Sequence, residues 1–322
     1  MLKFMLKALI KIIVFLGGAG IIGLALSGPM NLVLHWVLQP LRWIGLSESP
    51  LRDIGVTGRV EWTANYFSLT LGLLIASWLM TRFESRPIAS LGLGGGVSWL
   101  TELALGILLA FLTMIPVILM LHFFDPHIPI RPPQMRYSIP ADWLTLGGGI
   151  MLGLLILFGA LFEELTFRGY PFQTLMSAIG WWPTVIVTSG IFGIVHSTTH
   201  EASAWIAAGI LGLFMALLYL RSKSLWIVTG FHAGINGVMA ISAALGLIIF
   251  PQREPTENWL YPGMTGAMAL ILALWVFTYL KPSSKMEVLW QQHVPIAQPW
   301  AQLKGWWARR RQTPHDQTPP KG

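Results

Sequence analysis

Two adjacent acids lie inside a long apolar stretch of this sequence, at Glu163 and Glu164, with Arg168 one helical turn further on. An ionisable side chain at the centre of a membrane helix costs roughly 2.5–3.5 kcal/mol to insert, so such residues need a reason. Glu164 and Arg168 are four residues apart, and on a helix they share a face and can neutralise each other. Glu163 then points about 100° away and has no local partner. A carboxylate left alone in an apolar pocket suits general-base catalysis, which makes Glu163 the first candidate catalytic residue.

Two histidines and an asparagine lie in later apolar stretches. His196 stands four residues after Phe192, and His232 stands four residues before Asn236, so His232 and Asn236 face the same way on one helix. Together with Glu163, these residues supply a base, two imidazoles and an amide donor. That set suits the activation of a water molecule and the stabilisation of a tetrahedral oxyanion.

The composition shows which elements must position these residues. The chain has 322 residues, of which 54% are hydrophobic and 11% are charged, with a mean hydropathy of +0.62; a typical soluble domain has about 25% charged residues. Lipid must therefore be the solvent for part of the chain. The apolar runs are long and unbroken, as in membrane helices of about 20 residues, and unlike the short alternating strands of a barrel. The sequence predicts an all-α, polytopic membrane helix bundle.

About eight transmembrane helices are expected. They cover about Phe4–Ser27, Tyr66–Met80, Trp99–Phe124, an apolar run from Trp143 that carries Glu163, Trp182–Ser197, Ala204–Leu220, Leu225–Phe250 and Gly263–Leu280. The first resembles a signal peptide but has no A-x-A-like cleavage site, so we expect an uncleaved span. Residues 28–60 are predicted to be a connector with an amphipathic, interfacial piece at Met30–Leu46, and the five prolines in 125–142 indicate a loop.

These elements divide the chain into four predicted parts. Residues 1–84 hold N-terminal spans and the connector, 85–250 a candidate functional core, 251–280 the last span, and 281–322 a polar tail. No internal repeat and no soluble domain is evident.

The charges indicate an orientation in the membrane. The formal net charge is +7, but the basic residues cluster beside apolar spans, so membrane lipid rather than nucleic acid is the expected partner. If both termini are cytoplasmic, 14 Lys and Arg residues lie inside and 6 outside, with Arg168 set aside. This asymmetry predicts cytoplasmic termini and a place in the plasma (inner) membrane. The chain has no cysteine, which excludes disulfides and thiolate metal sites.

The three motifs, taken together, resemble a known family. Glu-Glu-x-x-x-Arg at 163–168, Phe-x-x-x-His at 192–196 and His-x-x-x-Asn at 232–236, each in its own apolar segment, are similar to the CPBP family of intramembrane metalloproteases. This family includes type II CAAX prenyl endopeptidases and bacteriocin-processing, immunity and lysostaphin-resistance-like membrane proteins. The resemblance is strongest over about residues 85–245.

The resemblance implies a role for each matching residue. Glu163 and His196 would activate the attacking water, His232 and Asn236 would resemble an oxyanion hole, and Glu164 and Arg168 would support the site. It implies an endopeptidase acting on membrane-associated or leader-bearing peptides, including CAAX-type prenylated ones. A metal is left open: Glu163, His196 and His232 could hold one Zn²⁺ as three protein ligands. The same residues could act without metal, which we favour because Asn236 is a poor zinc ligand and a good amide donor.

The predicted depths of the site residues do not agree. A helix hairpin at Gly180 places Glu163 and His196 at one level, about 25 Å from the turn, whereas His232 lies only about 13 Å into its span. We expect Pro171 to kink the helix or to let residues 170–181 lie along the interface, which would change these depths.

Other interpretations explain part of the three motifs. The acids could form a structural charge cluster, and His196, His232 and Asn236 could pack the core or join helices. The whole chain could be a non-catalytic scaffold or an immunity protein, or a transporter with midplane charges. The sequence has no His-Glu-x-x-His zinc motif and no Gly-x-Ser-x-Gly elbow, and no predicted span contains a pair of aspartates. The glutamate and histidine protease therefore remains the hypothesis that uses all three motifs.

Overall fold

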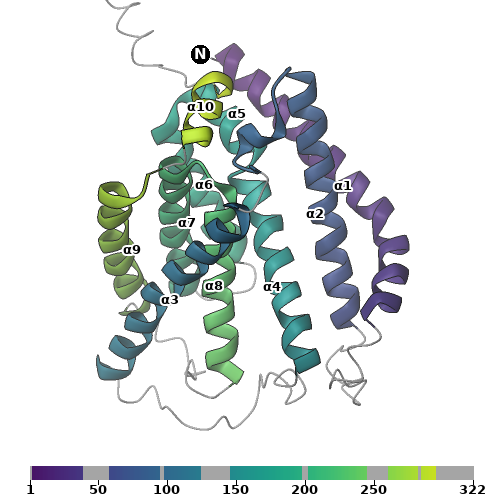
Figure 1. Ribbon diagram of the computed structural model, residues 1–322. Coiled ribbons are helices and arrows are strands. Elements are labelled where there is room, and N and C mark those ends of the chain that lie inside the picture. Colours follow the sequence, from purple (N-terminus) through teal and green to yellow (C-terminus); the bar gives the residue numbers. More distant parts are fainter. Residues whose placement is uncertain are drawn as a thin grey trace, which may run out of the picture.

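The computed structural model describes residues 2–38, 58–94, 98–124, 146–197, 202–244, 260–281 and 284–294. Within these ranges the chain is a bundle of α-helices with one short 3-10 helix and no strand (Figure 1), which confirms the predicted fold class. The predicted Pro-rich loop at 125–142 and the tail beyond residue 294 lie outside the described residues.

The elements follow one another along the chain as a series of apolar helices. They are α1 (Leu2–Leu38), α2 (Gly58–Phe83), η3 (Ile88–Leu91), α3 (Ser98–Phe124), α4 (Leu146–Phe167), α5 (Tyr170–Ile179), α6 (Trp181–His196), α7 (Ala202–Ser222), α8 (Leu225–Ala244), α9 (Leu260–Tyr279) and α10 (Ser284–His293). Among the described residues, five apolar segments are long enough to cross a membrane: Lys3–Val33, Trp62–Phe83, Ser98–Val117, Gly149–Ile179 and Trp205–Ser222. The other three predicted spans correspond to shorter apolar helices, Trp181–His196, Leu225–Ile241 and Gly266–Val276. The protein is an integral membrane protein.

The first helix is longer than predicted. The expected connector from residue 28 is wrong for residues 28–38, because α1 continues to Leu38 with Pro29 inside it. A proline is tolerated in a membrane helix where neighbouring groups satisfy the freed carbonyl, and the apolar run continues past it. The rest of the predicted amphipathic piece lies outside the described residues.

The helix that carries the acids ends soon after them. The backbone leaves the helix at Gly169 and starts the short helix α5 at Tyr170, with Pro171 in its first turn. A Cβ at Gly169 would lie 2.4 Å from the Leu165 carbonyl oxygen, so only glycine fits this tight turn. The break that we expected at Pro171 lies two residues earlier, at Gly169. Because α5 separates α4 from Gly180, residue counts from Gly180 do not give the depth of Glu163 in the membrane.

Small residues let two helices approach closely behind the site. Helix α3 packs against α8, and a Cβ at Gly230 would lie 2.1 Å from the Leu103 carbonyl oxygen. Gly106 and Gly234 make similarly close approaches on the two helices. Helix α2 packs against α4 in the same bundle. Small residues at such crossings are typical of membrane helices, where van der Waals contact replaces the hydrophobic effect.

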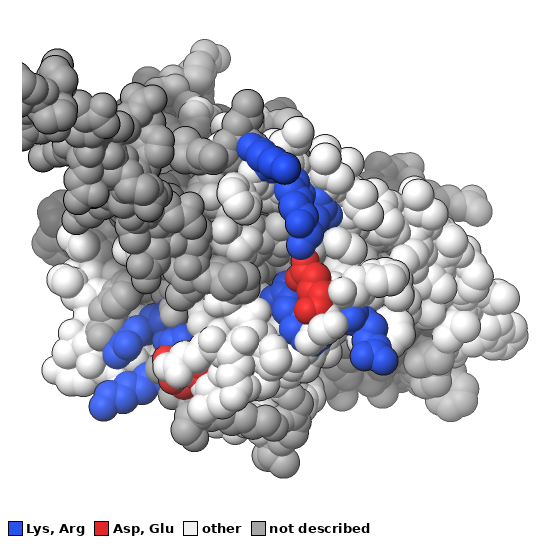
Figure 2. All heavy atoms as spheres, turned by 90° about the horizontal axis from the view of Figure 1, so that it is seen from above, with Lys and Arg blue, Asp and Glu red and all other residues white. Residues whose placement is uncertain are grey.

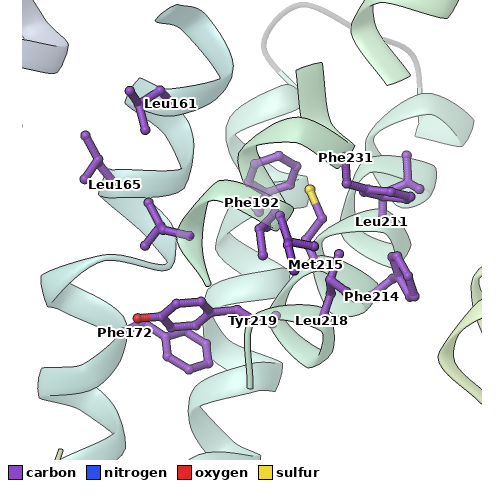
Figure 3. Close-up of a cluster of buried hydrophobic side chains, with 14 of the residues drawn as sticks. Leu161, Leu165, Phe172, Phe192, Leu211, Phe214, Met215, Leu218, Tyr219 and Phe231 are labelled. Carbon is purple, nitrogen blue, oxygen red and sulfur yellow. The ribbon is translucent and has the colours of Figure 1, made fainter. Parts of the chain in front are cut away.

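Aromatic and aliphatic side chains fill the interior between these helices. Figure 3 shows Leu161 and Leu165 from α4, Phe192 from α6, Phe231 from α8 and a row of residues from α7 packed together. Phe192 is also in ring contact with both motif histidines. The same side chain therefore belongs to the hydrophobic core and borders the candidate site.

Part of the predicted polar tail is structured. Helix α10 docks through Trp290, which is 3% exposed and lies 5.3 Å from the Tyr219 ring, centroid to centroid. Lys223 donates a hydrogen bond of 2.6 Å to Glu287 on the same helix. The polar composition of residues 281–322 did not indicate this short helix, which packs against the end of α7.

Candidate active site

A buried ion pair anchors the site. Glu164 and Arg168 are both 0% exposed, and the guanidinium donates to Glu164 Oε1 at 3.1 Å across one turn at the end of α4. Arg168 also donates to the Gly212 carbonyl of α7 at 3.0 Å and lies 4.5 Å from the centre of the Phe192 ring. The predicted pairing of the second acid with the arginine is therefore present, and it ties α4 to α6 and α7.

The second acid also holds a histidine. His232 Nδ1 lies 2.7 Å from Glu164 Oε1, and the imidazole side chain is only 7% exposed. With Glu164 ionised, Nδ1 is the donor and the other ring nitrogen, Nε2, is directed at Glu163, 3.7 Å from its Oε2. A carboxylate behind a histidine in this way sets both the tautomer and the orientation of the ring.

The other histidine is oriented by backbone. His196 Nδ1 lies 2.7 Å from the Phe192 carbonyl oxygen, which can only accept a hydrogen bond, so the proton is on Nδ1. Nε2 of His196 then faces Glu163 Oε2 at 4.0 Å. The Phe192 ring packs beside both imidazoles, with centroids at 4.7 Å and 5.8 Å.

Glu163 is the point at which these groups converge. Its Oε2 is buried and has no hydrogen-bond partner among the described residues, while the side chain as a whole is 25% exposed. The distances of 3.7 Å and 4.0 Å to the two Nε2 atoms are longer than direct hydrogen bonds. Separations of this size leave space for a small bridging species such as one water molecule.

Asn236 completes the set from the same helix as His232. It follows His232 by one turn of α8 and is half-buried, and its side chain makes no hydrogen bond to the described residues. The structure thus brings together Glu163, Glu164, Arg168, His196 and His232 by direct contact, and places Asn236 one turn away.

The donor types fit a divalent metal ion. Both imidazoles have Nδ1 engaged and Nε2 directed at the carboxylate, as metal-binding histidines do. Ligand atoms of a tetrahedral zinc site are about 3.3 Å apart, so the site would have to contract by several tenths of an ångström. Among the described residues, no three such side chains are already close enough to form a metal site.

Sequence reasoning missed two contributors to the site. The Gly212 carbonyl accepts from Arg168, and Tyr66 of α2 packs on Phe162 with ring centroids 5.9 Å apart, next to Glu163. No motif marks either residue, because their contribution depends on how α7 and α2 pack against α4.

The comparisons with known proteins agree with the motifs. Residues 145–238 match the family model for type II CAAX prenyl endopeptidases, Rce1-like, and this segment contains all six site residues. A candidate membrane peptidase of Bacillus subtilis (strain 168), YdiL, is 27% identical over 118 residues. That alignment covers 37% of this chain and 43% of the relative, so the chain spans less than half of the relative's length. No solved structure matches the chain with significance.

Proposed function

Because residues 145–238 match the family that the motifs indicated, which confirms the resemblance to CPBP proteins, we propose that this chain is an intramembrane endopeptidase. It hydrolyses peptide bonds of membrane-associated or leader-bearing peptides, CAAX-type prenylated ones being one class to test. The observation that carries the proposal is the Glu163 carboxylate oxygen, buried without a hydrogen bond and faced by two histidine nitrogens. A structural acid at membrane depth would be paired, as Glu164 is.

The proposed reaction starts with a water molecule between Glu163 and His196. Both acceptors, the carboxylate and Nε2, take hydrogen bonds from it, which leaves an oxygen lone pair free to attack the scissile carbonyl carbon. Glu163 receives the proton as the C–O bond forms and returns it to the amide nitrogen as the C–N bond breaks.

The developing oxyanion is assigned to His232 and Asn236. The Asn236 amide donates one hydrogen bond. The Glu164 carboxylate behind His232 supports the imidazolium form, in which Nε2 carries a proton and donates the second. Arg168 holds Glu164 in place through the hydrogen bond between their side chains. If a divalent metal binds, Glu163, His196 and His232 would hold it, and it would supply Lewis-acid activation of the water.

The experiment is cleavage of a peptide library by the purified protein in detergent, compared with Glu163→Ala, and with and without a chelator. Cleavage that Glu163→Ala abolishes supports the peptidase. Insensitivity to the chelator supports the metal-free reaction, whereas loss with the chelator and recovery with Zn²⁺ supports a metalloprotease. A cellular phenotype that survives Glu163→Ala would instead support the alternative, a non-catalytic membrane scaffold or immunity protein.

The same proposal includes the location. We place the chain as a multi-pass protein of the plasma (inner) membrane with both termini in the cytoplasm, on the charge asymmetry of its loops.

A further inference from the structure

Tyr66 of α2 lies beside Glu163, and the proposed reaction does not use it. The Tyr66 ring meets the Phe162 ring edge-on, with centroids 5.9 Å apart. A Cβ at Gly159 would lie 4.0 Å from Tyr66 Cε1, which is bonded to the carbon that carries the hydroxyl. Gly159 and Glu163 are four residues apart and share a face of α4. The phenol end of Tyr66 therefore lies near this face, close enough for the charge of Glu163 to act on it.

Contacts one turn before and one turn after Tyr66 hold this part of α2 against α4. The Thr63 hydroxyl donates to the Met151 sulfur at 3.3 Å, and the Thr70 hydroxyl donates to the Phe158 carbonyl oxygen at 3.2 Å. All three α2 positions lie on one face of the helix, because they are three and four residues apart. The place of Tyr66 next to the site is therefore set by the packing of the two helices, and not by its own side chain alone.

Glu163 lies between α2 and α8 on the surface of α4. Its two neighbours in the chain, Phe162 and Glu164, project about 100° to either side of it. Phe162 packs on Tyr66 of α2, whereas Glu164 is bonded to His232 of α8. A substrate group that contacts Glu163 consequently has Tyr66 on one side and His232 on the other.

The Tyr66 hydroxyl is a neutral donor in uncharged surroundings. The side chain is half-buried, and its hydroxyl makes no hydrogen bond to the described residues. Figure 2 shows Lys and Arg side chains beside acidic ones at one end of the bundle. By contrast, residues 62–81 of α2 and 146–162 of α4, which pack together beside Glu163, contain no Lys, Arg, Asp or Glu. A protonated phenol in such a place suits a neutral acceptor, and the acceptor that every peptide carries is a main-chain carbonyl.

We propose that Tyr66 binds the substrate, its hydroxyl donating a hydrogen bond to a main-chain carbonyl next to the scissile bond. Successive residues of an extended peptide face opposite sides. When the scissile carbonyl faces His232 and Asn236 of α8, the adjacent carbonyl faces α2. Main-chain hydrogen bonds of this kind hold a peptide whatever its side chains are. The inference rests on the proposed function, and it extends that site to α2, outside the matched residues 145–238.

The first test is Tyr66→Phe, which removes the hydroxyl and keeps the ring on Phe162. For a peptide that the parent cleaves, KM should rise about 2- to 12-fold with kcat almost unchanged, as for one neutral hydrogen bond made equally in the bound substrate and the transition state. Tyr279→Phe on α9, where the tyrosine is 68% exposed, is the matched control and should leave both constants unchanged. Both variants should unfold in detergent at the temperature of the parent.

A KM of Tyr66→Phe equal to that of the parent overturns the inference, because a residue that only packs on Phe162 keeps its ring in this variant. A fall in kcat at constant KM also overturns it, since the hydroxyl would then act in the transition state and not in holding the peptide.

The second test needs no cleavage and decides where no peptide is cleaved. The photoreactive residue p-azidophenylalanine replaces Tyr66 or, as the control, Tyr279, and each protein is irradiated with a biotin-labelled form of the same peptide library. Biotin should become attached to the protein altered at position 66, and excess unlabelled library should suppress the attachment. The protein altered at position 279 should stay at the level seen without light.

The two proposals fail separately. Cross-linking at position 66 without cleavage of any peptide would remove only the proposed function. Cleavage with an unchanged KM in Tyr66→Phe would remove only the role of Tyr66. Absence of both cleavage and cross-linking would remove both.

Discussion

The two adjacent glutamates of α4 have opposite surroundings. Glu164 is fully buried, paired with Arg168 and bonded to His232, whereas Glu163 is partly exposed and its Oε2 has no hydrogen-bond partner among the described residues. Position on the helix separates them by about 100°, which is enough to turn one toward the core and the other toward the site. Their substitutions should therefore separate stability from activity.

We expect Glu163→Gln to lower kcat by about 10²–10⁴, the range for loss of a general base, and to leave the unfolding temperature almost unchanged. Glu164→Gln should destabilise the protein by about 3–5 kcal/mol, because Arg168 is left as an uncompensated buried charge. Peptide cleavage and thermal unfolding in detergent measure the two effects. Equal effects of both variants on unfolding would contradict the separate roles.

Asn236→Ala should lower kcat by about 10²–10³ with little change in KM, as expected for loss of one oxyanion donor. The comparison is Asn65→Ala, which removes an exposed asparagine of α2 and should leave both constants unchanged. Steady-state kinetics on one cleaved peptide provide the readout. An Asn236→Ala enzyme with the kcat of the parent would exclude Asn236 from the oxyanion site.

At the scale of elements, the α3–α8 crossing determines where His232 and Asn236 lie. The close approach depends on glycines whose missing Cβ atoms leave room for backbone of the neighbouring helix. A shift of this crossing would move His232 away from Glu164, so packing behind the site controls geometry within it.

Gly230→Ala should destabilise the protein by about 1–3 kcal/mol, because its Cβ would lie 2.1 Å from the Leu103 carbonyl oxygen and overpacking forces the helices apart. Gly237→Ala on the same helix is the matched control: its Cβ would meet nothing within 4 Å. That control should be neutral or stabilise by up to about 1 kcal/mol through helix propensity. Thermal unfolding of both variants tests this, and similar loss in both would show that the crossing is not tight.

At the scale of the whole molecule, a polar network around Glu84 joins the N-terminal helices to the core. Glu84 accepts hydrogen bonds from Lys11 of α1, from Arg86 at 2.9 Å and from the Tyr170 hydroxyl of α5 at 2.8 Å. Burial by itself would raise the pKa of the Glu84 carboxyl. Hydrogen bonds from Lys11 and Tyr170 and the charge of Arg86 outweigh burial and hold that pKa below its ordinary value.

A lowered pKa in the folded state makes Glu84 stabilising above the pKa of the unfolded chain, about 4.3, and this contribution is lost as the pH falls through the folded value. The unfolding temperature in detergent should therefore fall more steeply between about pH 5 and pH 3 in the parent than in Glu84→Gln. Glu287, whose pKa is also lowered by its hydrogen bond from Lys223, is the control, with a side chain 37% exposed against 26% for Glu84. Glu287→Gln should change the pH profile much less, and equal flattening by both variants would contradict a specific role of Glu84.

The sequence by itself predicted the fold class, which the structure confirms, and it proposed the candidate site residues, for a physical reason in each case. Long apolar runs can be solvated only by lipid and must form helices there, which predicts the fold class. Charged groups inside such helices cost free energy to insert, which marks them as candidate functional residues. The i, i+4 spacing also predicted the Glu164–Arg168 pair, which depends on one helix alone.

Only the tertiary structure decided how the three motifs meet. His232 reaches Glu163 and Glu164 because α4 ends at Phe167 and α5 takes up the remaining depth, a break that depends on Gly169 lying against the Leu165 carbonyl. The continuation of α1 past Pro29 and the docking of α10 likewise depend on contacts between distant segments. A count of residues gives the depth of a side chain in the membrane only while the helix is unbroken. The packing of neighbouring helices determines where a helix breaks.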